Sequence, residues 1–282
     1  MKKLFTGIFA ACILLLIITP ADAAATQIKI DDVLVKSAIA PEVKNNRTMV
    51  PLRVISENLG AQVHWQDATI TLTLNQVTVQ LKLNSRTIIK NGHSEQLDVQ
   101  PYLKNNRAFV PIRFIAETFG SQVHYSNDLV HITNEALLLD NVKIQALRYE
   151  YHMTMGGVVQ DIKGNAYIKE ISKVFQEQQG HPVVAPVDYS WQPSIAQPGS
   201  YAKTGQYDFQ STEGKSLQQF DIYSLNKGFP VEVLEDSPAL LLHDVSADKW
   251  YTFTEKGVQS ISQLIQNAIK NGFNTVISNT VA

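Results

Sequence analysis

The sequence has a single cysteine among its 282 residues, and this residue, Cys12, lies inside an apolar run from Leu4 to Ile18. Beyond that run there is no thiol, which excludes disulfides, cysteine nucleophiles and cysteine-ligated metals. Basic and acidic residues are nearly balanced, at 24 and 26. Because no segment carries a cluster of lysine and arginine, the composition argues against nucleic acid as a partner.

The amino terminus has the pattern of a signal peptide. Lys2 and Lys3 precede the apolar run, and the small residues Ala21 and Ala23 stand at the positions that a signal peptidase requires. The alternative is a retained membrane anchor, but the run is shorter than the roughly 20 apolar residues of a spanning helix. We therefore expect residues 1–23 to be removed on export, and no later segment to span a membrane.

Sequence signatures of catalysis are also missing. The chain contains no G-x-S-x-G, no H-E-x-x-H, no phosphate-binding loop and no dinucleotide fingerprint. Glu150 and His152 are close enough to share one face of a strand, but no nucleophile is near them in sequence. We predict no catalytic residue and no cofactor. A pair of carboxylates of the glycosidase kind stays open, since it can be recognised only in space.

The strongest positive signal is an internal repeat with an offset of 60 residues. Residues 44–64 read KNNRTMVPLRVISENLGAQVH and residues 104–124 read KNNRAFVPIRFIAETFGSQVH, with 13 of 21 positions identical. Weaker similarity continues on both sides of these segments. The repeat indicates that the first half of the chain is a tandem duplication.

Each copy of the repeat predicts a strand, a short helix and further strands. Pro51 and Pro111 suit the first turn of a helix, where a missing N–H group costs nothing. Gly60 and Gly120 would end the helices in a left-handed conformation. Alternating apolar residues after each glycine predict half-buried strands. We expect one α+β domain over residues 28–135, with both helices in a shared core.

Several charged residues recur in both copies. Arg53 and Glu57, like Arg113 and Glu117, are four residues apart on the predicted helices. They would form either a recognition patch or ordinary ion pairs of a few tenths of a kcal/mol, and we favour the ion pairs. Arg47 and Arg107 are expected to bind loop carbonyl groups.

An NR dipeptide, then VP(L/I)R, then a helix of the form (V/F)I-x-E-x-(L/F)G, then a strand with an aromatic residue, resembles the stalk domain family. That family is also named the copper amine oxidase N-terminal-like domain, and the resemblance covers about residues 28–134. The Asn91-Gly92 turn also fits the pattern. One departure is Asp31-Asp32, where the family usually has an Asn-Gly-like turn.

The resemblance implies a domain of secreted Gram-positive proteins that is joined to many different partners and is not itself catalytic. Copper in the family name does not imply a metal site in this chain. His64 and His124 occupy equivalent positions on predicted strands, but a metal site needs three or four convergent ligands. We interpret both as surface residues and predict no metal.

The second half, residues 140–282, does not repeat the first and predicts a separate α+β domain. Strands are expected at 143–151, 207–209, 220–223, 231–234 and 250–253, and a helix from Asn165 to about Gln179, ended by Gly180. Thr254 would begin a last helix with an apolar stripe, ended by Gly272. Residues 182–201 contain four prolines and are expected to form a long loop.

The aromatic residues of this loop, Tyr189, Trp191 and Tyr201, are the candidate ligand-binding residues. Aromatic rings held among prolines can form a rigid platform for sugar rings or peptide. The competing interpretation, which we favour, is that these rings close the edge of the core.

From the sequence we therefore expect a secreted, non-enzymatic protein of the Gram-positive cell envelope. Its first domain would be a spacer or wall-associated module, and its second would bind a cell-wall polymer or another exported protein. Two alternatives stay open: an extracellular hydrolase with a carboxylate pair in the second domain, and a regulator or inhibitor of another exported protein.

Overall fold

The computed structural model describes residues 26–37, 39–234 and 237–281, so the predicted signal peptide lies outside the described residues. In the first half the elements are β1 (Gln27–Ile30), β2 (Val33–Leu34), β3 (Glu42–Lys44), β4 (Arg47–Pro51), α1 (Leu52–Asn58), β5 (Gln62–Gln66), β6 (Thr69–Leu74), β7 (Val77–Lys82), β8 (Thr87–Lys90), β9 (His93–Gln96), β10 (Tyr102–Lys104), β11 (Arg107–Pro111), α2 (Ile112–Thr118), β12 (Gln122–Ser126) and β13 (Leu129–Thr133).

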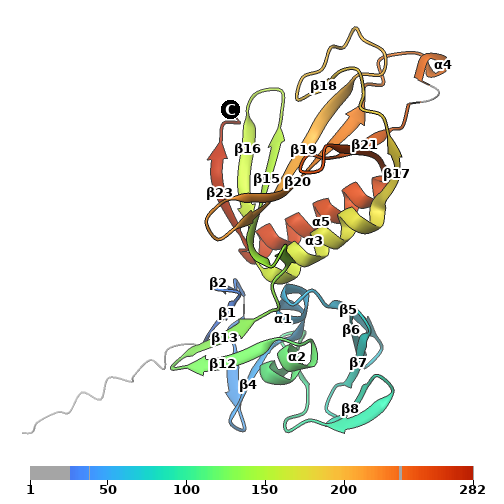
Figure 1. Cartoon of the computed structure of the whole chain (residues 1–282). Helices are drawn as coiled ribbons and strands as arrows, with labels where there is room; N and C mark the ends of the chain where they lie inside the picture. The colour runs from blue at the N-terminus through green and yellow to red at the C-terminus, as the bar shows by residue number, and fades with distance from the viewer. Residues whose placement is uncertain (1–25, 38, 235–236, 282) are drawn as a thin grey trace, which may run out of the picture.

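The second half continues with β14 (Leu138–Leu139), β15 (Val142–His152), β16 (Gly157–Ile162), α3 (Asn165–Gln178), β17 (Gln179–Val183), β18 (Tyr189–Ser190), β19 (Tyr201–Ser211), β20 (Ser216–Leu225), α4 (Val231–Leu234), β21 (Leu240–Asp244), β22 (Lys249–Phe253), α5 (Glu255–Asn271) and β23 (Asn274–Asn279). Strands and helices are mixed in both halves (Figure 1), which confirms the α+β class.

The two repeated segments have the same local structure. Pro51 and Pro111 each end a strand and stand immediately before α1 and α2. Gly60 and Gly120 follow the helices with φ angles of 85° and 81°, the left-handed conformation in which a glycine has no steric penalty. The proline and glycine therefore mark the two ends of each helix.

The two copies differ in the strand that pairs with the second strand after the helix, which is β6 in the first copy and β13 in the second. In the first copy, β6 pairs with β7 in antiparallel fashion and belongs to a sheet of order β5-β6-β7-β8-β9. In the second copy, the equivalent strand β13 pairs in parallel with β1, in a sheet of order β12-β13-β1-β2. The amino-terminal strand thus occupies the position beside β13 that β7 occupies beside β6.

The turns of the first half follow the expected chemistry. Asn91 and Gly92 connect β8 and β9 with φ angles of 49° and 82°, which is the pattern of a tight hairpin with two left-handed residues. Asp31 and Asp32 have φ angles of 49° and 67° between β1 and β2. The two aspartates that depart from the family pattern therefore still form a left-handed turn.

The second half is dominated by one large sheet of order β17-β22-β21-β20-β19-β15-β16-β23, with β14 beside β15 and β18 beside β19. Helices α3 and α5 lie side by side against this sheet (Figure 1). Phe175 of α3 packs against Tyr207, Phe209, Phe220 and Phe253 of the sheet. Thr254 accepts a hydrogen bond from Gly257 N at the start of α5, and Gly272 ends the helix with a φ of 88°, as predicted.

Three local predictions for the second half were wrong. Residues 231–234 form the short helix α4 and not a strand; Pro230, whose φ is fixed near the helical value, accepts the hydrogen bond of Val233 N there. The loop predicted at 182–201 contains β18 and the end of β17. Gly180 supplies no left-handed turn and lies within β17, where a Cβ atom would stand 2.2 Å from Thr252 Oγ1.

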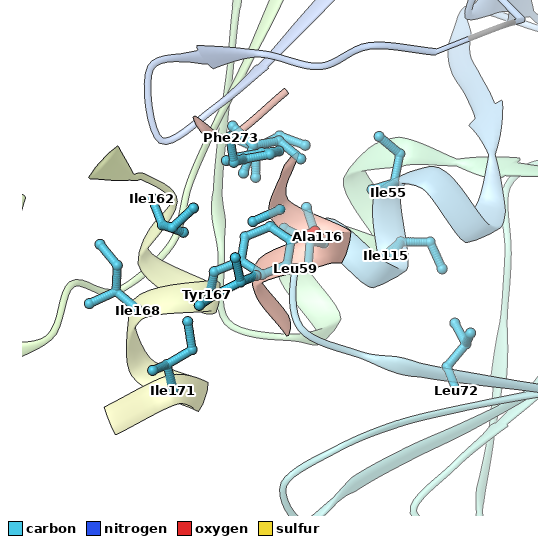
Figure 2. Packing of buried hydrophobic residues seen from close by; sticks show 14 of the residues in the cluster. Ile55, Leu59, Leu72, Ile115, Ala116, Ile162, Tyr167, Ile168, Ile171 and Phe273 are labelled. Atoms are coloured by element: carbon cyan, nitrogen blue, oxygen red, sulfur yellow. The ribbon is translucent and has the colours of Figure 1, made fainter. Parts of the chain in front are cut away.

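One buried apolar cluster runs through both halves of the chain. It contains Ile55 and Ile115 of the two repeats, as predicted for a shared core, and also Ile168 of α3 and Phe273 after α5. Figure 2 shows these residues converging near the amino terminus of α3. The repeats are therefore packed directly against the helical side of the second half.

Candidate functional site

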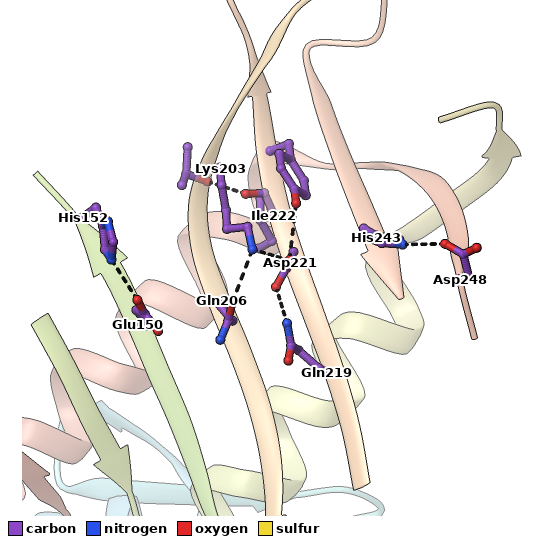
Figure 3. A network of polar contacts seen from close by, with 11 residues as sticks. Glu150, His152, Lys203, Gln206, Gln219, Asp221, Ile222, His243 and Asp248 are labelled. Atoms are coloured by element: carbon purple, nitrogen blue, oxygen red, sulfur yellow. Dashed lines mark hydrogen bonds and ion pairs between the residues drawn. The ribbon is translucent and has the colours of Figure 1, made fainter. Parts of the chain in front are cut away.

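The candidate site lies on the face of the large sheet that is turned away from α3 and α5. Side chains alternate between the faces of a strand, so Tyr149, Tyr207 and Phe220 enter the core while their neighbours point outward. The outward residues form a continuous cross-strand row, and Figure 3 shows most of it. In register from β15 to β22, this row consists of Glu150, Gln206, Asp221, His243 and Trp250.

A buried ion pair lies at the centre of this outer face. Lys203 Nζ is 2.5 Å from Asp221 Oδ2, and their side chains are only 13% and 4% exposed. Gln219 Nε2 donates to Asp221 Oδ1 at 3.0 Å, and Tyr223 OH donates to Asp221 Oδ2 at 3.3 Å. Burial, and then the negative charge of Asp221, raise the pKa of Tyr223. The phenol is therefore held protonated as a hydrogen-bond donor.

Lys203 reaches Asp221 diagonally across the β19–β20 pair, because it stands opposite Tyr223, which is two residues from Asp221 on the same face of β20. The pairing of β19 with β20 slips between Lys203 and Gly205, and such a bulge re-aims the side chains on either side of it. Sequence reasoning missed this pair. The detectable signal was an acidic residue, Asp221, inside the short stretch Phe220–Tyr223, whose other three residues are Phe, Ile and Tyr.

A second polar row crosses the sheet beside the first. Arg148 donates to Asp161 through Nε at 2.9 Å and Nη2 at 3.2 Å, a two-pronged contact that raises the pKa of Arg148. The next residue in register is Asp208, which is 8% exposed. Gln210 Nε2 donates to Asp208 Oδ2 at 2.6 Å, whereas Asp208 Oδ1 has no hydrogen-bond partner among the described residues.

The three aromatic residues singled out from the sequence lie at the distal end of this face, in different surroundings. Tyr189 and Tyr201 are neighbours across the β18–β19 pair. Tyr201 is buried and its hydroxyl donates to Pro238 O at 2.7 Å, whereas Tyr189 is half-exposed with its ring 4.7 Å from that of Trp250. The ring of Trp191 is stacked on that of His152, with ring centres 4.0 Å apart.

Trp191 and His152 belong to a polar corner of the site. His152 Nε2 is 2.7 Å from Glu150 Oε1, and Lys203 Nζ lies 5.1 Å from the Trp191 ring centre, in cation–π range. The structure thus joins the Glu150–His152 pair to one of the three loop aromatics. Sequence spacing indicated the pair, but not the tryptophan that covers it.

Two cavities adjoin these residues. One of about 350 Å³ is lined mainly by apolar residues of the proline-rich segment and by Tyr201. The other, of about 320 Å³, is lined by Glu150, His152, Gln192 and the ends of β16 and β23. A hydrolase of the glycosidase type needs two carboxyl groups about 5–9 Å apart. The first cavity is lined by no carboxyl group and the second by Glu150 alone.

The histidines of the repeats lie on the surface. His64 on β5 and His124 on β12 are both exposed, and His124 stands opposite His131 in the strand register. No group of three potential ligands suitable for a metal ion occurs among the residues that the structure describes.

The charged motif residues of the repeats make local contacts. Arg53 and Glu57 are 3.5 Å apart, and Arg113 and Glu117 are 3.7 Å apart, both as exposed pairs within one helix. Arg47 donates to Asn46 O at 3.3 Å, as expected for a loop carbonyl, but its main partner is Asp98 at 2.5 Å. For Arg107, the described residues include no hydrogen-bond partner of its side chain.

Comparison with known proteins finds a family similar to the first half of the chain. Residues 29–133 match the copper amine oxidase N-terminal domain family. This confirms the family resemblance of the repeats.

One curated relative is described as a protease inhibitor of Brevibacillus choshinensis. It is 28% identical over 89 residues, which are 31% of this chain and 27% of the relative. The chain therefore matches only about a quarter of that relative's length. Among the described residues, no helix is both long and apolar enough to cross a membrane.

Proposed function

We propose that this chain is a secreted, non-enzymatic protein of the Gram-positive cell envelope, built from two domains. Residues 28–135 would be a stalk-type spacer formed by a tandem strand-helix-strand duplication. Residues 140–282 would be a separate α+β domain that binds a wall polymer or an exported protein. The observation that carries the proposal is the copper amine oxidase N-terminal domain match at 29–133.

The geometry supports a binding role for the second domain. Both cavities adjoin this half, next to the polar outer face of the sheet and the aromatic residues Tyr189 and Trp191. In the first half, the charged motif residues Arg53–Glu57 and Arg113–Glu117 form exposed ion pairs within one helix, which stabilise a protein little. A spacer that carries a separate recognition surface fits this distribution.

Cell fractionation with an antibody against the chain tests the proposal. The protein should occur in the culture medium or in wall digests, and its first residue should be Ala24. A variant with Leu14→Arg and Leu15→Arg, which interrupts the apolar run, should stay in the cell uncleaved. If the native chain is found only in the cytoplasm and begins at Met1, the proposed export is wrong.

The ligand-binding part has its own test. The exported chain, fixed on beads, is exposed separately to wall fragments and to proteins of the culture medium. Retention of one fraction, competed by free chain, supports the binding role. If neither fraction is retained, the second domain does not have this role.

A second candidate function is inhibition of an exported protease. It is favoured by the similarity to a relative described as a protease inhibitor. Purified chain would then slow casein hydrolysis by the proteases of a culture supernatant in a saturable way. Unchanged hydrolysis at a large molar excess of chain would remove this candidate.

A further inference from the structure

The cavity of about 320 Å³ has a floor of two cross-strand rows on the outer face of the large sheet. β15, β16 and the end of β23 contribute one residue each to both rows. In register, the first row is Glu150, Val159 and Ser278, and the second is His152, Gly157 and Thr280. The walls come from the β15–β16 turn and from Gln192 of the proline-rich segment. Three strands and one loop therefore build the cavity together.

The His152 ring is held beside the cavity by three contacts. Its Nε2 atom is 2.7 Å from Glu150 Oε1 (Figure 3), and its face is stacked on the Trp191 ring with centres 4.0 Å apart. A Cβ atom on Gly157 would stand 2.7 Å from His152 Cδ2, so the imidazole fits only because that residue is a glycine. The polar lining thus has a fixed geometry.

The lining supplies hydrogen-bonding groups of several kinds. The Glu150 side chain is 25% exposed, and among the described residues its Oε2 atom has no hydrogen-bond partner. Gln192 adds an amide, and Thr154 and Ser278 add hydroxyl groups, which both donate and accept. Pockets for small ligands begin at about 300 Å³ and are usually lined mainly by apolar side chains. This cavity has that size but a mostly polar lining, which suits a hydrophilic ligand.

The charges around the cavity favour a neutral ligand. Among the described residues that line it, none is a lysine or arginine, so an anion would meet only the Glu150 carboxylate. The nearby Lys203 is no substitute, because its Nζ atom is 2.5 Å from Asp221 Oδ2 and its side chain is 13% exposed. A cation would find one carboxylate whose other oxygen is already bonded to His152. A neutral molecule with many hydroxyl and amide groups avoids both mismatches.

We propose that this cavity binds an N-acetylated sugar residue of a cell-wall polymer. This inference rests on the proposed binding role of the second domain and selects the wall polymer as its ligand. Sugar hydroxyl groups donate and accept hydrogen bonds at once, which matches the carboxylate, amide and hydroxyl groups of the lining. The acetamido group carries its own amide for Gln192 and a methyl group for the apolar side chains of Met153 and Val159.

Two neutral sugars test the assignment on the exported chain. Calorimetry should show saturable binding of the N-acetylglucosamine tetramer, with an affinity at least about tenfold higher than that of maltotetraose, the corresponding glucose tetramer. The reason is that a site built to hydrogen-bond a group rejects the analogue that lacks it. No saturable binding of the acetylated tetramer, or equal affinities for the two sugars, would overturn the proposal.

The glucosamine tetramer separates recognition of the acetamido group from attraction to the carboxylate. It has free amino groups in place of the acetamido groups, and these carry positive charge when protonated. It should bind at least about tenfold more weakly than the acetylated tetramer. Equal or tighter binding would mean that the cavity selects charge, and would refute the sugar assignment.

Ser278→Tyr fills the cavity from its β23 side. Ser278 is exposed, so a larger side chain is tolerated there, and the affinity for the acetylated tetramer should fall at least about tenfold. Ser126→Tyr is the matched control, because Ser126 is exposed on the edge strand β12 of the first half. It should leave binding unchanged. Equal affinities of the two variants would contradict the assignment to this cavity.

Glu150→Gln removes the carboxylate with almost no change of shape. Because hydrogen bonds to a charged acceptor are the stronger ones, the acetylated tetramer should bind about tenfold more weakly. Glu213→Gln, in the exposed β19–β20 turn, is the matched control and should bind like the native chain. An unchanged affinity of Glu150→Gln would overturn the role given to the carboxylate.

Failure of this inference can be told from failure of the proposed function. If the chain retains wall fragments but does not bind the acetylated tetramer, the binding role stands and the sugar site is wrong. If Ser278→Tyr retains wall fragments as well as the native chain does, the polymer binds elsewhere, which also refutes the site. Retention of culture-medium proteins alone would identify an exported protein as the partner and overturn the sugar assignment.

Discussion

Val50 of β4 and Val110 of β11 are paired directly opposite each other. They occupy equivalent positions in the two repeats. On either side of them, Pro51 pairs with Phe109 and Met49 pairs with Pro111. Because Pro51 corresponds to Pro111 and Met49 to Phe109, these two pairs are the same pair with the repeats exchanged. Such pairing is expected where a two-fold relation passes through an antiparallel strand pair. Both valines are fully buried, so the repeats meet in a common core.

This common core gives the first prediction. Ile55 and Ile115 are fully buried and belong to one apolar cluster. Replacing either with alanine should lower the free energy of unfolding by about 2–5 kcal/mol, through lost burial and a residual cavity. Val43→Ala, at an exposed position, should change it by less than about 0.5 kcal/mol. Urea denaturation measures all three, and an effect of Ile115→Ala as small as that of Val43→Ala would contradict a shared core.

The glycines after the helices give the second prediction. Gly60→Ala and Gly120→Ala should each cost about 1 kcal/mol, the penalty of a side chain in the left-handed conformation. A Cβ at Gly60 would lie 3.5 Å from Ala166 Cβ, an ordinary contact, and at Gly120 nothing lies within 4 Å. The two costs should therefore be similar.

Gly164 provides the comparison for this pair. Its φ is also positive, but a Cβ there would lie 2.6 Å from Phe273 Cδ1. Gly164→Ala should consequently lower the melting temperature more than either of the other two variants. If all three variants melt together, steric contact does not add to the backbone strain.

Some features of the fold could be predicted from the sequence and others could not. The repeat, the proline and glycine at the ends of the two helices and the Asn91-Gly92 hairpin depend on local chemistry, and each could be predicted from a few neighbouring residues. The Lys203–Asp221 pair depends on the register between two long strands. The stack of Trp191 on His152 joins residues from distant segments. Pairing and stacking of this kind leave no periodic signal in the sequence.

The third prediction concerns the contact between the repeats and α3. Tyr167 OH donates to Asn58 Oδ1 at 2.8 Å in a buried position, and Asn271 Nδ2 donates to Tyr167 OH at 2.9 Å. Tyr167→Phe removes this hydroxyl and leaves the two amides unpaired, which should cost about 1–3 kcal/mol at neutral pH. Tyr125→Phe, on the exposed strand β12, should cost less than about 0.5 kcal/mol.

The same tyrosine predicts a dependence on pH. Burial raises the pKa of Tyr167 to about 12. Because the folded chain then retains a proton that the unfolded chain loses above about pH 10, the contribution of Tyr167 is complete below pH 10 and is lost as the pH rises through 12. The stability advantage of the native chain over Tyr167→Phe should shrink across that interval. A constant difference in urea midpoints between pH 9 and pH 12 would contradict the raised pKa.

The fourth prediction concerns Asp31 and Asp32, the two aspartates that depart from the family pattern. The Asp31 carboxylate accepts hydrogen bonds from the backbone and side-chain amides of Asn134, at 2.8 and 2.9 Å, and of Asn165, at 2.8 and 3.2 Å. It thereby connects the β1–β2 turn to the end of β13 and to the start of α3. An Asn-Gly turn would supply the backbone shape but not this acceptor.

Asp31→Asn should therefore destabilise the chain by about 1.5–3 kcal/mol, the usual range for hydrogen bonds to a charged group. Asp32→Asn is the control, because Asp32 is exposed and asparagine tolerates its left-handed φ. It should be nearly neutral. Thermal melts that show equal losses for the two variants would mean that the carboxylate does not hold the halves together.

The last prediction concerns metal binding by the repeats. His64 and His124 are exposed on separate strands, and the described residues hold no cluster of three ligands suitable for a metal ion. Replacing either with alanine should change the free energy of unfolding by less than about 1 kcal/mol, as substitutions at the surface usually do. Addition of copper or zinc should leave the melting temperature unchanged, because a ligand stabilises a protein only when it binds the folded state preferentially. His124 and His131 are opposite each other in the strand register, so His131→Ala belongs in the same series. A rise in melting temperature with copper or zinc that is lost in the His124→Ala and His131→Ala variants would demonstrate a two-histidine site and overturn the metal-free assignment.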